Sequence, residues 1–252
     1  MKKINYLFLF VVFFLVLRPL YAQEPSNAEW IKTISIGAAG LGTGAALMLV
    51  PTPDCRWCAP NALDEKVSSA LILKNTAPIR LSSDIIAFGL TPILAFGSLL
   101  LGPTSTKSFI RDALVIADAL AITAALTEIA KISARRARPD SIYGDDHGPQ
   151  ANRSFWSGHT SFTFAALSSA SVLALRNNYA WAPYFAGAAA LVGTFVGYSR
   201  IAASRHWFSD VIVGMGVGIG VGVAMPFLTL DPKSPRVTIA SNPPAFLLGF
   251  AW

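Results

Sequence analysis

The chain has 252 residues, of which 53 % are hydrophobic and only 13 % are charged, and its mean hydropathy is +0.51. Ordinary soluble domains carry about 25 % charged residues, so this composition indicates a membrane protein and argues against a soluble globular one. The formal net charge of +6 does not indicate nucleic-acid binding, because part of it lies near the N-terminus and much of the rest gathers around one motif. No polar linker separates two cores, so we expect a single domain.

The N-terminal segment has the layout of a bacterial export signal. Two lysines precede an apolar run over residues 6–17, and Leu20-Tyr21-Ala22 follows it. This pattern predicts a signal peptide over residues 1–22 that is cleaved after Ala22, with an uncleaved membrane anchor as the alternative. Either form directs the chain across the inner membrane.

Cys55 and Cys58 are separated by two residues in a polar stretch. In an oxidising compartment a local disulfide is the simplest interpretation of this pair. A thioredoxin-like redox pair requires a βαβ setting that is missing here, and a zinc site requires a second ligand pair that the three histidines do not supply at suitable spacing.

Six long helices are predicted after the signal, over about residues 30–50, 82–101, 107–133, 158–176, 180–199 and 207–228. Their Ala, Gly and Ser content favours close helix packing, and several reach the roughly 20 residues that cross a bilayer. We therefore expect an all-α, six-helix bundle over residues 23–230 that is embedded in a membrane. Residues 231–252 change character and predict a short irregular or β tail.

Three details of these segments carry further expectations. The last helix has glycines at alternate positions from Gly214 to Gly222, which predicts backbone-to-backbone packing. The third helix contains Asp112, Asp118 and Glu128, which should face the bundle interior, a cavity or water. The mixed segment 51–81 fits an amphipathic surface helix.

The first polar motif pairs Lys131 with Arg138. They are seven positions apart, about two helical turns, so they would share one face of a continuous helix. Pro139 disfavours helical geometry at Arg138, so the helix should end near that point and both cations can converge on one anion. The alternative is a basic cluster over residues 135–138 that touches lipid headgroups.

The second motif is Ser157-Gly158-His159, at a predicted loop-to-helix junction. Ser154 or Ser157 can cap the helix, whose exposed amides bind anions, and Gly158 permits a close backbone approach. His159 is then placed to transfer a proton to a bound group. The alternative is a helix cap beside an incidental histidine.

The third motif joins Arg200 to His206 and Asp210. His206 and Asp210 lie four residues apart, so on a helix they share a face and can hydrogen-bond. A carboxylate on one imidazole nitrogen fixes the tautomer and leaves the other nitrogen as a nucleophile. The planar fork of Arg200 suits phosphate oxygens. The alternative is a surface His–Asp pair that caps a helix.

The three motifs, in this order, resemble those of the type 2 phosphatidic acid phosphatase and vanadium haloperoxidase superfamily. Its Lys-x6-Arg-Pro pattern corresponds to Lys131–Pro139, and its Ser-Arg-x5-His-x3-Asp pattern to Ser199–Asp210. The similarity covers about residues 80–228. The family's Pro-Ser-Gly-His is Trp156-Ser157-Gly158-His159 here, which removes a fixed backbone angle from the turn and puts its geometry in doubt.

The resemblance implies a phosphatase that needs no metal or other cofactor. His206 would attack phosphorus and Asp210 would orient it, while His159 would protonate the leaving oxygen and later activate water. The phosphoryl oxygens would be held by two groups of residues: the cations Lys131, Arg138 and Arg200, and the loop residues Ser157 and Gly158.

The expected substrate is a lipid phosphate or pyrophosphate, because the bundle is apolar. A soluble periplasmic acid phosphatase, a vanadium-dependent haloperoxidase and a non-enzymatic membrane scaffold are the alternatives. Family resemblance and the cysteine pair favour a site that faces the periplasm. A cleaved signal followed by three crossings would instead turn the motifs to the cytoplasm, and the arginines of residues 135–138 agree with either side.

Overall fold

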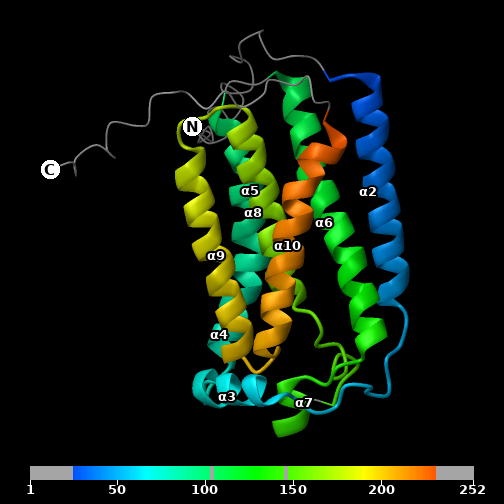
Figure 1. Ribbon diagram of the computed structural model, residues 1–252, viewed down its shortest axis with the longest axis vertical. Helices are drawn as coiled ribbons and strands as arrows, with labels where there is room; N and C mark the ends of the chain where they lie inside the picture. Colours follow the sequence, from blue (N-terminus) through cyan, green and yellow to red (C-terminus); the bar gives the residue numbers. More distant parts are fainter. Residues whose placement is uncertain (1–24, 103–104, 145–146, 231–252) are drawn as a thin grey trace, which may run out of the picture.

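A computed structural model describes residues 25–102, 105–144 and 147–230. Every regular element in these ranges is a helix (Figure 1). The α-helices are α2 (Asn27–Met48), α3 (Ala62–Leu71), α4 (Ala77–Ile85), α5 (Thr91–Ser98), α6 (Thr106–Ala134), α7 (Pro139–Tyr143), α8 (Gly158–Arg176), α9 (Ala182–Ala202) and α10 (Phe208–Thr229). A π-helical turn, Ile86–Leu90, joins α4 to α5, and the 3₁₀ turn Leu99–Leu101 follows α5. The expected all-α class is confirmed.

The long helices match the six predicted stretches, with α4, the π turn and α5 forming one of them. The expected end of α6 before Arg138 is confirmed. This helix ends at Ala134 because Arg135 adopts a left-handed conformation with φ of 43°, so Lys131 and Arg138 do not lie on one helix. Arg138 instead takes an extended conformation before α7, as the following proline favours. The predicted export signal and C-terminal tail lie outside the described residues.

Glycines set the distance between α10 and α8. A Cβ atom at Gly218 would lie 2.4 Å from the carbonyl oxygen of Ser161, and one at Gly214 would lie 2.8 Å from that of Ser157. Gly216 meets no described atom within 4 Å of such a Cβ position. The expected backbone-to-backbone packing therefore holds for one face of α10, and it brings the start of α10 against the start of α8.

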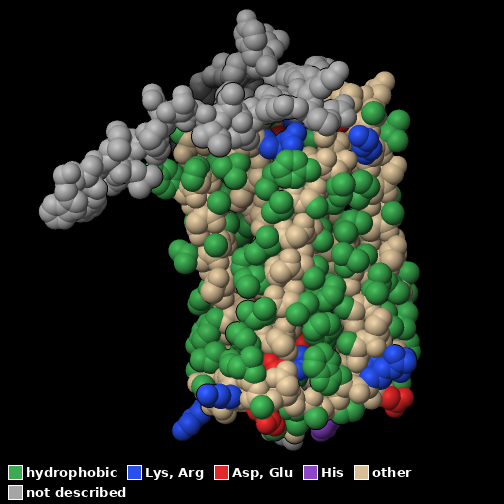
Figure 2. All heavy atoms as spheres, viewed as in Figure 1, with side chains coloured by type: hydrophobic (Ala, Val, Ile, Leu, Met, Phe, Trp, Pro, Cys, Tyr) green, Lys and Arg blue, Asp and Glu red, His purple; other side chains and the backbone are tan. Residues whose placement is uncertain are grey.

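The flank of the bundle is apolar and its ends are polar (Figure 2). Large hydrophobic side chains such as Leu41, Ile93 and Leu191 are more than 60 % exposed there. Within the described ranges, five helical stretches are long and apolar enough to cross a membrane. The three carboxylates of α6 are buried, as expected. An apolar flank between two charged ends is the surface of a membrane-spanning bundle.

The polar motifs gather at one end of the bundle. The ends of α6 and α9 and the starts of α4, α8 and α10 lie there, together with α3 and α7 (Figure 1). The expected amphipathic helix of segment 51–81 is present as α3, although its Asp64 is fully buried.

Candidate active site

A cleft of about 400 Å³ opens at the motif-bearing end of the bundle. Six of the predicted site residues line it: Lys131, Arg138, Gly158, His159, Arg200 and His206. Ser157 and Asp210, the remaining members of the motifs, are fully buried behind its wall. Five further residues line the cleft, namely Arg80, Asp84, Phe88, Gln150 and Arg205. The described lining contains five cations and one carboxylate, so the cleft favours the binding of an anion.

His206 has a defined tautomer. Its Nδ1 lies 2.8 Å from the backbone carbonyl oxygen of Ser154. A carbonyl oxygen only accepts hydrogen bonds, so Nδ1 carries the proton and Nε2 keeps its lone pair. Burial, followed by the charges of Arg138 and Arg200, holds the pKa of His206 well below its usual value. The imidazole is therefore neutral, with one nucleophilic nitrogen in a cationic cleft.

Asp210 approaches His206 differently from the prediction. His206 lies before α10 and not on it, and its Nδ1 is 3.8 Å from Asp210 Oδ2. That carboxylate oxygen accepts hydrogen bonds from Ser154 Oγ at 2.5 Å and from the Trp207 backbone N–H at 3.0 Å. The second of these bonds caps α10, which explains why the helix starts at Phe208. Asp210 thus holds the Ser154 residue whose carbonyl orients His206.

Lys131 is anchored by a carboxylate. Its Nζ lies 2.7 Å from Glu128 Oε1, and the other oxygen of Glu128 accepts a hydrogen bond from Arg153. Arg138 is only 6 % exposed and donates to the carbonyl oxygen of Arg153 at 3.3 Å. The basic segment that includes Arg138 is therefore built into the site. Contact of this residue with lipid headgroups, the alternative interpretation, is excluded by its burial.

Asp84 of α4 connects two of the motifs and was not predicted. Its Oδ1 lies 2.8 Å from His159 Nε2 and 3.1 Å from Arg200 Nη1. Arg200 also donates to Ser83 Oγ at 2.8 Å. The ring of Phe88 packs edge-on against His159 with their centroids 4.6 Å apart. One helix outside the motifs therefore holds both an acid–base candidate and a phosphate-binding candidate.

The loop before α8 is held by side chains on both sides. Ser157 is the residue before the helix, but its hydroxyl pairs with Thr160 Oγ1 at 2.9 Å and does not cap a backbone N–H, so the predicted side-chain cap is wrong. Ser154 does not cap α8 either, because its hydroxyl binds Asp210. Trp156, which stands where the family has proline, donates from its indole nitrogen to Thr127 Oγ1 at 2.9 Å.

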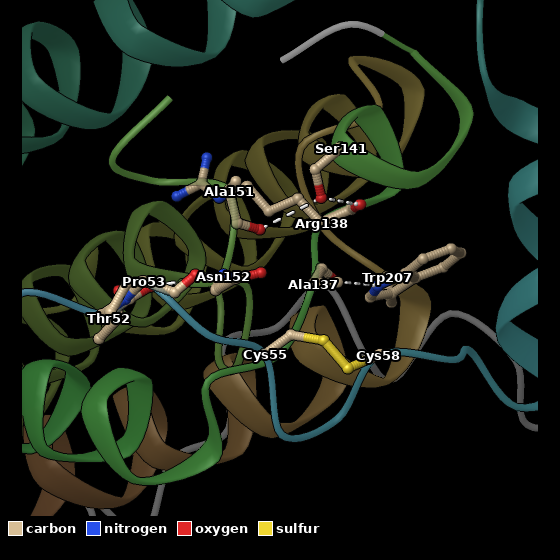
Figure 3. The surroundings of a disulfide bond; sticks show 10 residues. All are labelled: Thr52, Pro53, Cys55, Cys58, Ala137, Arg138, Ser141, Ala151, Asn152 and Trp207. Carbon is tan, nitrogen blue, oxygen red and sulfur yellow. Dashed lines mark hydrogen bonds between the residues drawn. A yellow bond between two sulfur atoms is a disulfide. The ribbon is translucent and has the colours of Figure 1, made fainter. Parts of the chain in front are cut away.

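Cys55 and Cys58 form a disulfide that lies outside the cleft, beside the segment that follows α6 (Figure 3). The Arg56 N–H donates to the Arg135 carbonyl oxygen at 3.0 Å, and the Ala137 N–H donates to that of Trp57 at 3.1 Å. The cysteine loop therefore braces the chain between the first motif's lysine and its arginine.

Sequence reasoning missed residues of two kinds. Arg80 and Asp84 belong to α4 and Phe88 to the π-helical turn that follows it, and neither element carries a recognisable motif. Arg205 precedes a predicted histidine directly and is paired with Asp140 at 2.5 Å. The position of Arg205 directly before His206 could have identified it as a site residue. Nothing in the spacing of the other three marks them as site residues.

Comparisons with known proteins bear on the family and the fold of this chain. Residues 112–231 match the PAP2 superfamily. A lipid A 1-phosphatase from Porphyromonas gingivalis is 38 % identical over 103 residues, which cover 40 % of this chain but only 20 % of that relative.

A solved structure shares the fold. The transmembrane PAP2-type phosphatidylglycerolphosphate phosphatase from Bacillus subtilis matches with a TM-score of 0.53 and 18 % identity, over 78 % of this chain and 94 % of that one. This match shows a shared fold. The fold and the match over residues 112–231 both support the resemblance of the chain to the PAP2 superfamily.

Proposed function

We propose that this protein is a metal-independent phosphatase that hydrolyses a lipid phosphate monoester or pyrophosphate through a phosphohistidine intermediate. The observation that carries the proposal is the state of His206. Its Nδ1 proton is committed to the Ser154 carbonyl at 2.8 Å, which leaves Nε2 as a nucleophile in a cleft lined by cations.

In the first step, His206 Nε2 attacks the phosphorus atom and the bond from phosphorus to the leaving oxygen breaks. His159, across the same cleft, gives its proton to that oxygen. Lys131, Arg138 and Arg200 bind the other phosphoryl oxygens, with the Gly158 amide supplying a further hydrogen bond. Removal of one such well-placed donor costs on the order of 3 kcal/mol of barrier lowering.

In the second step, His159 accepts a proton from water while the water oxygen attacks the phosphohistidine. The bond from phosphorus to His206 Nε2 breaks, and inorganic phosphate leaves. Burial and the charge of Arg200 lower the pKa of His159, and the carboxylate of Asp84, 2.8 Å from His159 Nε2, opposes that shift and so supports the imidazolium form that the first step requires. Both transfers therefore use one imidazole, first as an acid and then as a base.

The exterior of α4 supports a lipid substrate. Leu81 and Ile85 of α4 and Phe88 of the following π-helical turn are each more than half exposed. Phe88 also lines the cleft. A phosphoryl group in the cleft can therefore remain attached to an acyl or prenyl chain that lies on the apolar flank.

We further propose that the cleft faces the periplasm. The disulfide lies at the same end of the bundle as the cleft, and disulfides persist in oxidising compartments. The start of α2 lies at the opposite end and is then cytoplasmic, so this orientation excludes a signal that is cleaved after Ala22 with α2 as the next crossing (Figure 1). A membrane-impermeant maleimide added to intact cells after mild reduction should label Cys55 and Cys58; labelling only after lysis would place the cleft in the cytoplasm.

The activity is tested with detergent-purified protein in the presence of a metal chelator. Phosphate release is measured from phosphatidate, a prenyl pyrophosphate and a soluble aryl phosphate, for the wild type and His206→Ala. We expect turnover of a lipid substrate, its loss in the variant, and an acid-labile, alkali-stable phosphoprotein in the wild type alone.

The other outcomes separate the alternatives. Turnover of the aryl phosphate alone would favour a non-specific acid phosphatase. Turnover that survives His206→Ala would refute the covalent mechanism. Halide oxidation by the vanadate-loaded protein, without phosphatase activity, would favour a haloperoxidase.

A further inference from the structure

Arg136 is a fully buried cation that the proposed chemistry does not use. Its Nη1 lies 2.5 Å from Asp210 Oδ1 and its Nη2 lies 2.6 Å from Asp64 Oδ2. All three side chains are no more than 1 % exposed. Ser209 completes the cluster by donating its backbone N–H and its hydroxyl to Asp64, at 2.8 and 2.7 Å. One guanidinium thus joins α3 to the start of α10.

Two hydrogen bonds, one between Ser154 and Asp210 and one between His206 and Ser154, connect this cluster to the nucleophile. Asp210 uses one oxygen for Arg136 and the other for Ser154 Oγ. The carbonyl oxygen of Ser154 in turn accepts the Nδ1 proton of His206. The cleft lining does not include Arg136, so this residue can affect the position of His206 without touching the substrate.

The cysteine loop holds Arg136 from the other side. The guanidinium carbon lies 3.7 Å from the ring centroid of Trp57, a cation–π distance. Trp57 lies inside the ring that the Cys55–Cys58 disulfide closes. Backbone hydrogen bonds on both sides of Arg136 tie its segment to the same loop. The place of this disulfide beside the segment after α6 is seen in Figure 3.

We propose that Arg136 is a positioning residue for His206, acting through Asp210 and Ser154, and that the disulfide-closed loop around Trp57 holds Arg136 in place. The inference rests on the proposed function, because it assigns the network to the nucleophile of that reaction. A planar fork is required, since a single ammonium cannot bridge two carboxylates in this geometry. Asp64 is the second anchor of the same fork.

The main test compares Arg136→Lys and Arg136→Gln with Arg135→Gln, which removes the neighbouring charge without a contact to Asp210. Folding is checked by size exclusion and thermal melting in detergent. We expect kcat to fall at least about tenfold in the Arg136 variants while KM stays within about twofold, because the phosphate-binding cations are untouched. Arg135→Gln should keep the wild-type kcat.

Arg136→Gln leaves two buried carboxylates without their cation and can prevent folding. A second pair of variants therefore tests the same proposal with Arg136 in place. Trp57→Leu and the double variant Cys55→Ser/Cys58→Ser loosen the loop but keep Arg136. Both should lower kcat by a few-fold at unchanged KM, and reduction of the wild type should reproduce the effect of the double variant.

His206→Ala is measured in parallel to separate the two proposals. Full activity of His206→Ala would refute the proposed function itself. If His206→Ala is inactive while folded Arg136→Lys and the loop variants keep the wild-type kcat, the positioning role is refuted and the function stands. A rise in KM that matches the fall in kcat would also overturn it, since the variants would then distort the whole cleft.

Discussion

Asp210 does not hydrogen-bond His206; it holds the residue that does. The 3.8 Å separation between Asp210 Oδ2 and His206 Nδ1 contrasts with the 2.5 Å hydrogen bond from Ser154 Oγ to the same carboxylate oxygen. Ser154 therefore carries two functions, a hydroxyl that binds the carboxylate and a carbonyl that binds the imidazole. The orientation of the nucleophile depends on a backbone group that is fixed by a buried acid.

Ser154→Ala should lower kcat more than a remote serine deletion of the same kind. The carbonyl remains and Asp210 keeps its bond from the Trp207 N–H, but the buried carboxylate loses a charged hydrogen bond, which is worth roughly 1.5–3 kcal/mol. We expect a fall in kcat of about three- to tenfold, with KM unchanged. Ser171→Ala is the matched control, because Ser171 is also buried and its hydroxyl donates to the Leu167 carbonyl of its own helix, away from the cleft. Equal kcat values for the two variants would show that the hydroxyl does not support catalysis.

Asp84→Asn should separate affinity from turnover. Loss of the carboxylate removes the one negative charge that lines the cleft, so inorganic phosphate should inhibit at lower concentration. His159 loses an anionic partner at 2.8 Å, so protonation of a poor leaving group should slow. We expect kcat to fall more for an alkyl lipid phosphate than for an aryl phosphate, whose leaving group needs less protonation. A uniform change in kcat for both substrates would contradict this role of Asp84.

Much of the fold could be predicted because it depends on the length of the apolar segments and on the small residues at which helices pack closely, and both can be read from the sequence. The motif residues were also predictable, since phosphate chemistry needs cations and imidazoles at characteristic spacings. The link from Asp210 to His206 could not be predicted, because it runs through the backbone carbonyl of Ser154, which residue spacing does not reveal. The four-residue spacing indicated a shared helix face, yet Asp210 caps the helix and leaves His206 outside it.

Long-range partners explain the other omissions. Asp84 meets His159 across 75 residues of sequence, and Arg136 meets Asp64 across 72. Neither acid belongs to a motif, and Arg136 resembles a surface basic cluster until the fold buries it. Bundle packing creates these pairs, so only the three-dimensional structure reveals them.

The pH dependence of the free enzyme should reflect the lowered pKa of His206. A depressed pKa means that the imidazole stays neutral as the pH falls through about 6.5, where an ordinary histidine becomes protonated. The rate of phosphohistidine formation at low substrate concentration should therefore not decline between about pH 7.5 and 6 on account of His206. Rapid-quench measurement of the phosphoprotein tests this expectation. A decline centred near pH 6.5 that follows His206 would contradict the neutral, buried state.

Phe88→Ala should weaken the use of lipid substrates selectively. Phe88 is 57 % exposed and also lines the cleft, so it can contact the first carbons of a lipid chain. We expect KM for a lipid phosphate to rise several-fold, with little change for an aryl phosphate. Ile93→Ala is the control, because Ile93 is 68 % exposed on the continuing helix α5 but does not line the cleft. The same rise in KM for both substrates would indicate that Phe88 acts on the phosphoryl site instead.

Gly218→Ala and Gly216→Ala should have opposite effects on stability although they lie on the same helix. A methyl group at Gly218 would meet the Ser161 carbonyl oxygen at 2.4 Å, whereas one at Gly216 meets no described atom within 4 Å. Forced separation of α8 and α10 costs typically 1–3 kcal/mol, and alanine at an open helical glycine gains up to about 1 kcal/mol. Thermal melting in detergent should therefore show a lower Tm for Gly218→Ala and an unchanged or higher Tm for Gly216→Ala. The helices α8 and α10 carry His159 and Asp210 at their starts, so Gly218→Ala should also reduce kcat. A destabilised Gly218→Ala variant with full activity would show that the site tolerates a shift between these helices.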